Sequence, residues 1–142
     1  RPGKSSQRIS RVEATMDVAA RDFVRARAEN RCEYCSLEQS QVDHAPFVVE
    51  HIIAKQHLGG DDLSNLALAC DRCNAFKGPN IAGLDPQTSS LVPLFNPRQQ
   101  AWREHFAFAG PLIIGLTPEG RTTVEILNMN ATERVQLRAE TA

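Results

Sequence analysis

The sequence of 142 residues lacks a long hydrophobic run, an export signal and an excess of positive charge. No stretch approaches the roughly 18 uninterrupted apolar residues of a membrane-spanning helix, which excludes a protein built on helical membrane spans. Residues 1–4 have none of the apolar character that the core of a secretory signal shows. Together these absences predict a soluble, cytoplasmic protein with no membrane partner.

The charge balance limits how the chain could bind nucleic acid. The formal net charge is −1 at pH 7, whereas a protein that binds nucleic acid through its whole surface usually carries a clear cationic excess. Any such contact must therefore come from a local patch. The basic residues that lie in or after the motif region are the candidates for it: Lys55, Arg72, Lys77, Arg98 and Arg103. For each of them taken singly, an ordinary solvated side chain is the simpler interpretation.

Length and composition indicate one compact domain. A chain of 142 residues, of which 42% are hydrophobic, is long enough to bury one core and short for two. Residues 1 to about 14 are polar and lack periodicity, so we expect a flexible arm without an assigned function. We expect a single domain over residues 15–142, with a motif-bearing core at 31–78 and a carboxy-terminal extension at 79–142.

Local patterns in the core predict a helix, two strands and a short helix. Residues 17–28 carry apolar side chains at helical spacing. The β-branched and aromatic segment 47–53 predicts a strand, and the short apolar segment 65–70 is compatible with a second one. Asp71 is suited to cap a brief helix that ends by Gly78. This order predicts a small α+β core with flanking helices on both sides.

The extension is predicted to be irregular first and helical at its end. Prolines favour an extended segment at 93–97, and a helical turn follows at 99–105. Thr117 and Pro118 are suited to the cap and the first position of a helix that continues to about residue 127. A last helix is predicted at 132–138.

The cysteines form two C-x-x-C pairs, separated by 34 residues: Cys32, Cys35, Cys70 and Cys73. Two disulfides are an alternative, but thiols of a chain without an export signal stay reduced and bind metal more readily. Two such pairs can present four thiolates tetrahedrally to one Zn²⁺ ion. Because four cysteines leave no open coordination position, we expect this zinc to be structural. The gap exceeds the roughly 15 to 20 residues of a zinc ribbon, which implies that a folded segment lies between the pairs.

Polar residues stand in that segment where packing would favour apolar ones. Glu50 and His51 lie on the first predicted strand, Asn65 begins the second, and Asn74 follows the last cysteine. A carboxylate and an amide oxygen are hard ligands suited to Mg²⁺ or a similar ion. A neutral histidine beside that ion can accept a proton from an attacking water. This combination predicts hydrolysis of a phosphodiester bond.

The motifs resemble those of the HNH endonucleases, in the subgroup that binds zinc through four cysteines. The resemblance runs in order through R-C-E-Y-C at 31–35, V-E-H-I-I at 49–53, G-G at 59–60, N-L at 65–66, C-D-R-C-N at 70–74 and K-G at 77–78. It implies the family's ββα-metal fold and a metal-dependent endonuclease whose partner is nucleic acid, with double-stranded DNA as the expected substrate. The intervals of 14 and 9 residues between His51, Asn65 and Asn74 also fit the family.

The resemblance implies a role for each motif residue. His51 takes the first HNH position and is the general base, Asn65 takes the second and positions the loop and the base, and Asn74 takes the third. Asn74 and Glu50 would hold the catalytic metal. The third position is Asn rather than His, and the carboxylate before the base is Glu rather than Asp. Oxygen ligands of this kind favour Mg²⁺ or Mn²⁺ over a tightly bound transition metal.

A non-catalytic zinc module that binds nucleic acid or a protein partner is the alternative. Such a module would need the cysteines but not the polar residues between them. His44, His57 and His105 are left out of the catalytic set, because loop or packing positions account for them. The sequence leaves open DNA versus RNA, sequence specificity, nicking versus double-strand cleavage, and oligomeric state.

Overall fold

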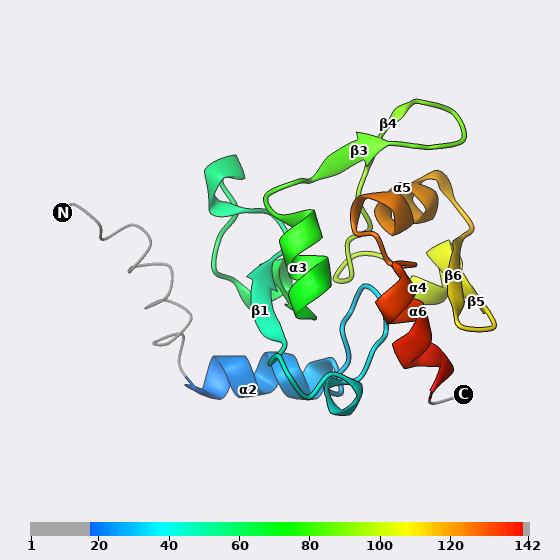
Figure 1. Cartoon of the computed structure of the whole chain (residues 1–142). Helices are drawn as coiled ribbons and strands as arrows, with labels where there is room; N and C mark the ends of the chain where they lie inside the picture. Colours follow the sequence, from blue (N-terminus) through cyan, green and yellow to red (C-terminus); the bar gives the residue numbers. More distant parts are fainter. Residues whose placement is uncertain (1–17, 141–142) are drawn as a thin grey trace.

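A computed structural model describes residues 18–140 of the chain (Figure 1). The polar arm expected at 1–14 and the first residue of the helix expected at 17–28 lie outside the described residues. The helices are α2 (Val18–Arg27), α3 (Asp71–Lys77), α4 (Trp102–His105), α5 (Pro118–Ile126) and α6 (Thr132–Ala139). The strands are β1 (Val48–His51), β2 (Leu66–Ala69), β3 (Ala82–Leu84), β4 (Leu91–Pro93), β5 (Phe106–Ala109) and β6 (Leu112–Gly115). The strands form three antiparallel pairs, β1–β2, β3–β4 and β5–β6, so the predicted α+β class is confirmed.

The first strand pair and α3 form a ββα unit. In β1–β2, Glu50 lies opposite Ala67 and His51 lies opposite Leu66. All four residues of β2 are buried, and α2 and α3 both contact the two strands. In Figure 1, β1 lies beside α3 and above α2.

The start of α3 differs from the prediction in its capping residue. Asp71 was expected to cap the helix, but the cap is Cys70, whose Sγ accepts a hydrogen bond from the backbone N–H of Cys73. Asp71 is instead the first helical residue, and its carboxylate lies 3.0 Å from Nη2 of Arg134. The helix ends at Lys77, where Gly78 has a φ of 50°. Sulfur thus takes the place that a side-chain oxygen usually fills at a helix cap.

The carboxy-terminal part contains two strand pairs that the sequence interpretation missed. β3–β4 encloses residues 85–90, and β5–β6 turns at Gly110, whose φ is 60°. Helix α5 packs against β3, β4 and β6. It begins where predicted, because the Thr117 hydroxyl accepts a hydrogen bond from the Gly120 N–H and Pro118 follows it.

One continuous hydrophobic core joins the two parts of the chain. Its buried members run from Val24 on α2 to Met129, and they include the four cysteines. The indole Nε1 of Trp102 donates a 2.8 Å hydrogen bond to the carbonyl of Tyr34, so the extension is attached directly to the first C-x-x-C pair. No helix within residues 18–140 is long and apolar enough to cross a membrane.

Candidate functional site

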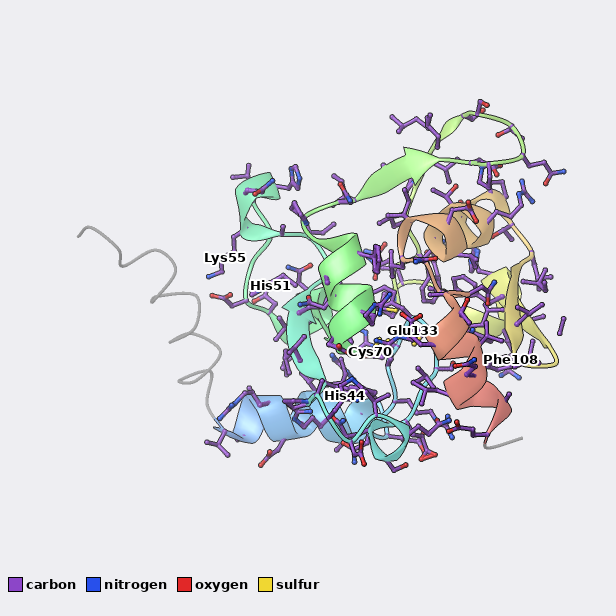
Figure 2. All side chains as sticks on the ribbon, in the orientation of Figure 1. His44, His51, Lys55, Cys70, Phe108 and Glu133 are labelled. Atoms are coloured by element: carbon purple, nitrogen blue, oxygen red, sulfur yellow. The ribbon has the colours of Figure 1, made fainter. Side chains whose placement is uncertain are left out.

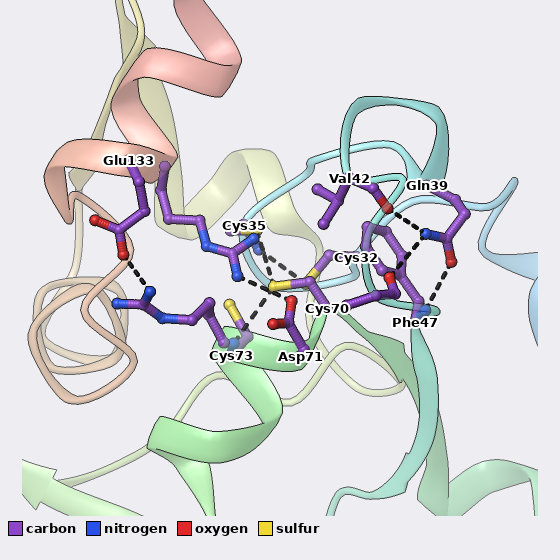
Figure 3. A network of polar contacts seen from close by, with 12 residues as sticks. Cys32, Cys35, Gln39, Val42, Phe47, Cys70, Asp71, Cys73 and Glu133 are labelled. Carbon is purple, nitrogen blue, oxygen red and sulfur yellow. Dashed lines mark hydrogen bonds and ion pairs between the residues drawn. The ribbon is translucent and has the colours of Figure 1, made fainter.

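The four cysteines meet in one buried cluster, here called the tetracysteine cluster (Figure 3). Their sulfur atoms all lie within 4.8 Å of one another, and those of Cys35 and Cys70 are 3.7 Å apart. In each C-x-x-C pair the N–H of the second cysteine points at the sulfur of the first, at 3.4 Å for Cys35 and 3.3 Å for Cys73. This donor set is suited to a metal ion, as the spacing of the cysteines predicted.

Two arginines of α6 bring positive charge to the tetracysteine cluster. Arg134 and Arg138 are both buried, and Arg134 forms its ion pair with Asp71 beside Cys70. Burial lowers the pKa of Arg134, but the negative charge of Cys70 and Asp71 outweighs it and raises that pKa overall. Nε and Nη1 of Arg134 have no hydrogen-bond partner among residues 18–140. Arg134 therefore places buried positive charge close to the sulfur atoms of Cys70 and Cys35, which favours a negatively charged state of the cluster.

The second group of predicted residues lines an open cavity of about 380 Å³. Glu50 and His51 reach it from the end of β1, and Asn74 reaches it from α3. The side chain of Asn74 makes no hydrogen bond to the residues between 18 and 140, so its amide is available to a ligand. The structure therefore brings together three residues that are separated by as many as 24 positions in the sequence.

The Glu50 carboxylate is held in the wall of this cavity by two side chains. Tyr34 donates a 2.6 Å hydrogen bond to Oε2, and the Lys77 ammonium lies 3.1 Å from Oε1. Burial raises the pKa of Glu50, while Lys77 and Tyr34 act to lower it. Each oxygen of a carboxylate can accept more than one bond. The orientation of the Glu50 carboxylate is therefore fixed, and its oxygen atoms retain lone pairs for a further ligand.

Lys77 does not belong to a basic surface patch, which corrects one of the expectations above. Its side chain is only 2% exposed, and its ammonium also donates to the carbonyls of Ile52, at 2.9 Å, and His51, at 3.3 Å. These bonds use all three of its N–H groups. Lys77 consequently ties α3 to the end of β1 instead of facing a phosphate.

Most of the other basic candidates are also paired. Arg98 contacts Glu33, and Arg72 forms an ion pair with Glu133. Lys55 pairs with Asp61 but keeps an exposed side chain beside the cavity. Arg103 is exposed. The local patch that the sequence suggested is therefore reduced mainly to Lys55 near the candidate site.

His51 contacts a carboxylate that the sequence interpretation did not select. Its Nε2 lies 2.8 Å from Oδ1 of Asp61, and the His51 side chain is 13% exposed. His51 and Lys55 lie on the same side of the molecule, away from Glu133 and Phe108 (Figure 2). Asp61 directly follows the G-G pair at 59–60 in the sequence. The two adjacent acidic residues, Asp61 and Asp62, were the only sign in the sequence that a carboxylate could contact His51.

Asn65 lies beneath this loop and does not line the cavity. Its Nδ2 donates to the carbonyls of Gly60, at 2.8 Å, and Ile53, at 3.0 Å, while its Oδ1 accepts from the Ile53 N–H at 2.8 Å. A Cβ on Gly59 would lie 1.8 Å from the Ile53 carbonyl oxygen, so this position requires glycine. The geometry supports the positioning role that the family resemblance implied for Asn65.

The other histidines remain outside the candidate site. Nδ1 of His105 lies 2.6 Å from the Thr117 hydroxyl, and the His105 ring packs 5.7 Å from that of Phe95. His44 and His57 are exposed, and neither lines the cavity that contains His51. Their exclusion from the catalytic set stays a prediction.

Comparison with known proteins finds a family match within this segment. The HNH endonuclease family model matches residues 32–79, a range that includes the tetracysteine cluster and the residues around the cavity. The chain is 26% identical over 110 residues to the Septu protein PtuB of Bacillus thuringiensis, and the match covers 76% of this chain. The chain spans about 40% of the length of that curated relative. No solved structure matches it.

Proposed function

We propose that this chain, whose residues 32–79 form a domain of the HNH endonuclease family, is a metal-dependent endonuclease that hydrolyses phosphodiester bonds in double-stranded DNA. Three side chains of the matched segment, two from β1 and one from α3, line one open cavity, and this observation carries the proposal. They combine a carboxylate, an imidazole and an amide. A module that only binds nucleic acid needs no such combination.

We assign a structural Zn²⁺ ion to the tetracysteine cluster. Zinc–sulfur bonds of about 2.3 Å in a tetrahedron place the sulfur atoms about 3.8 Å apart, and the observed separation of Cys35 and Cys70 is 3.7 Å. Zn²⁺ with four thiolates has a net charge of −2, and the buried guanidinium groups of Arg134 and Arg138 offset part of this charge, since Arg134 is also paired with Asp71. The charge of the surroundings and the sulfur geometry both support this ion.

Glu50 and Asn74 would hold a second divalent ion, Mg²⁺ or Mn²⁺, at the cavity. Both present oxygen atoms, and an ion of this type keeps several waters and needs only one or two protein ligands beside the phosphate. Among residues 18–140, the tetracysteine cluster is the one group of three or more His, Cys, Asp or Glu side chains that could hold a metal ion. An ion at the cavity would therefore have only one or two protein ligands, as Mg²⁺ and Mn²⁺ accept. When bound, the ion supplies positive charge to the phosphate as negative charge develops on it.

His51 is the proposed general base. It lies at the end of β1, lines the cavity beside Glu50, and takes a proton from the water that attacks phosphorus. Lys77 and Tyr34 hold Glu50 in its direction, and Asn65 holds the loop above His51. The exposed ammonium of Lys55 at the edge of the cavity is placed to contact a neighbouring phosphate.

Nicking of supercoiled plasmid in Mg²⁺ or Mn²⁺ tests the function. His51→Ala should lower the rate on the order of a hundredfold or more, as expected for the loss of a positioned base. DNA binding in a gel-shift assay at the same salt concentration should persist, because phosphate contacts come mainly from Lys and Arg.

His57→Ala is the matched control, since that histidine is exposed, lies in the short 3₁₀ helix Lys55–His57 and does not line the cavity. It should nick at the wild-type rate. Wild-type nicking by His51→Ala would overturn the proposed mechanism. Binding without cleavage by the wild-type protein would favour the non-catalytic alternative.

A further inference from the structure

We infer that Asp61 is a positioning residue that orients the imidazole ring of His51 by accepting a hydrogen bond from its Nε2–H. The free Nδ1 then becomes the nitrogen that accepts a proton. The catalytic use of this arrangement rests on the proposed function, whereas the orientation of the ring does not. Asp61 lies ten residues after His51 and outside the set of residues that the family motif identified.

The contact between the two side chains decides which nitrogen carries the proton. Nε2 of His51 lies 2.8 Å from Oδ1 of Asp61. In a neutral imidazole one nitrogen donates and the other accepts, and an ionised carboxylate only accepts. The proton of neutral His51 must therefore be on Nε2 for this contact to be favourable. A partner on one ring nitrogen commonly sets the role of the other in this way.

Asp61 is held in the ionised form by a second partner. The Lys55 ammonium lies 3.0 Å from both of its carboxylate oxygens. The hydrogen bonds from His51 and Lys55 hold the pKa of Asp61 below its usual range. Asp61 is therefore an anion at neutral pH and acts only as an acceptor.

The loop backbone fixes Asp61 although its side chain is 47% exposed. Asn65 binds the carbonyl of Gly60, the residue directly before Asp61, and it also binds the backbone of Ile53, two residues after His51. The absence of a side chain at Gly59 lets the loop approach the Ile53 carbonyl closely. One asparagine thus sets the distance between the segments that carry His51 and Asp61.

The neighbouring acid Asp62 provides a matched control for this proposal. It is exposed, caps the short 3₁₀ helix Leu63–Asn65 through its backbone conformation, and has no hydrogen bond or ion pair to His51. Asp61 and Asp62 share charge, size and loop. They differ in their contacts, because Asp61 binds both His51 and Lys55, whereas Asp62 binds neither side chain.

Nitrogen-15 NMR of the histidine rings in the full, zinc-loaded chain reads the proton position directly. At about pH 8, wild-type His51 should show the proton on Nε2 and a bare Nδ1. Its signals are assigned by their loss in His51→Ala. Asp61→Ala should give a mixture of the two proton positions, Asp61→Asn should keep more of the Nε2–H form than Asp61→Ala, and Asp62→Asn should match the wild type.

Plasmid nicking supplies the second measurement. Asp61→Ala should lower kcat roughly 10- to 100-fold with little change in KM, as is typical when a partner that orients a site residue is removed, and Asp62→Asn should not. A wild-type proton on Nδ1, or an Asp61→Ala spectrum equal to that of the wild type, would overturn the inference. Failure of the wild-type protein to nick DNA, with the proton still on Nε2, would reject the proposed function and leave the orientation by Asp61 in place.

Discussion

The hydroxyl of Tyr34 donates a 2.6 Å hydrogen bond to Oε2 of Glu50. Tyr34 stands inside the first C-x-x-C pair, and Glu50 stands in the wall of the candidate catalytic cavity. Both side chains are buried, and Trp102 from the extension binds the Tyr34 carbonyl. Tyr34 therefore links the first C-x-x-C pair to both the cavity and the extension through hydrogen bonds.

Tyr34→Phe removes this hydrogen bond with little change in shape. A hydrogen bond to a charged group contributes about 1.5–3 kcal/mol, so the free energy of unfolding in urea should fall by about that amount. Metal content should be unchanged, because Tyr34 supplies no ligand to the tetracysteine cluster, and nicking should weaken. An unchanged unfolding free energy would show that Tyr34 does not hold Glu50.

Metal analysis should find about one zinc per chain in the tetracysteine cluster. Cys70→Ser should give a poorly folded protein, because the binding energy of a structural metal is part of the folding energy, and here Sγ of Cys70 also caps α3. Removal of zinc by a strong chelator should lower the melting temperature of the wild-type chain in the same way. A folded, metal-free protein of native stability would reject the structural zinc.

Asn74→Ala should abolish Mg²⁺- or Mn²⁺-dependent nicking and leave the zinc in place, because the two ions use separate ligands. Asn74 tests this better than Glu50 does, since Glu50→Ala would also leave the buried Lys77 ammonium unpaired, at a cost of about 3–5 kcal/mol. Asn80→Ala is a suitable control, because Asn80 is exposed just beyond the same helix. If Asn74→Ala lost its zinc and still nicked DNA, the assignment of Asn74 to the catalytic ion and not to the zinc would be wrong.

Gly59→Ala should destabilise the loop that carries Asp61. The new Cβ would lie 1.8 Å from the Ile53 carbonyl oxygen and 2.9 Å from Nδ2 of Asn65, and overpacking of this kind typically costs about 1–3 kcal/mol. Gly60→Ala is the matched control, because its nearest atom would be 3.6 Å away, at Oδ2 of Asp62. Gly59→Ala should unfold at a lower urea concentration than Gly60→Ala and should nick plasmid more slowly. Equal behaviour would contradict the close approach at Gly59.

The ion pair between Asp85 and Arg121 should make part of the stability depend on pH. Two hydrogen bonds from Arg121, of 3.0 and 2.8 Å, hold the pKa of Asp85 well below its usual range. A lowered carboxyl pKa stabilises the fold above the ordinary value of about 3.9, and this stabilisation is lost as the pH falls through the lowered value. Asp85→Asn should therefore destabilise the protein at pH 7. Its difference from the wild type in urea should shrink on acidification, and a difference that is constant with pH would exclude this ion pair as the cause.

Local chemical signals were sufficient for the family, the fold class and several elements. The C-x-x-C spacing predicted the tetracysteine cluster, and the HNH motif was confirmed by the family match to residues 32–79. Thr117 followed by Pro118 predicted the start of α5, because a cap depends on residues that are adjacent in the chain. The catalytic roles of Glu50, His51, Asn65 and Asn74 remain predictions that the experiments above test.

The partners of these residues were decided only by the tertiary structure. Lys77 lies 27 residues from Glu50, and Trp102 lies 68 residues from Tyr34, so no local pattern connects the members of either pair. The two missed strand pairs are short, and β5 alternates only weakly between buried and exposed positions. The sequence by itself determined which cysteine, carboxylate, amide and imidazole groups the chain carries. The packing of α3, α6 and the extension decided which of them are buried, charged and free to react, because burial and pairing depend on residues that only the folded chain brings together.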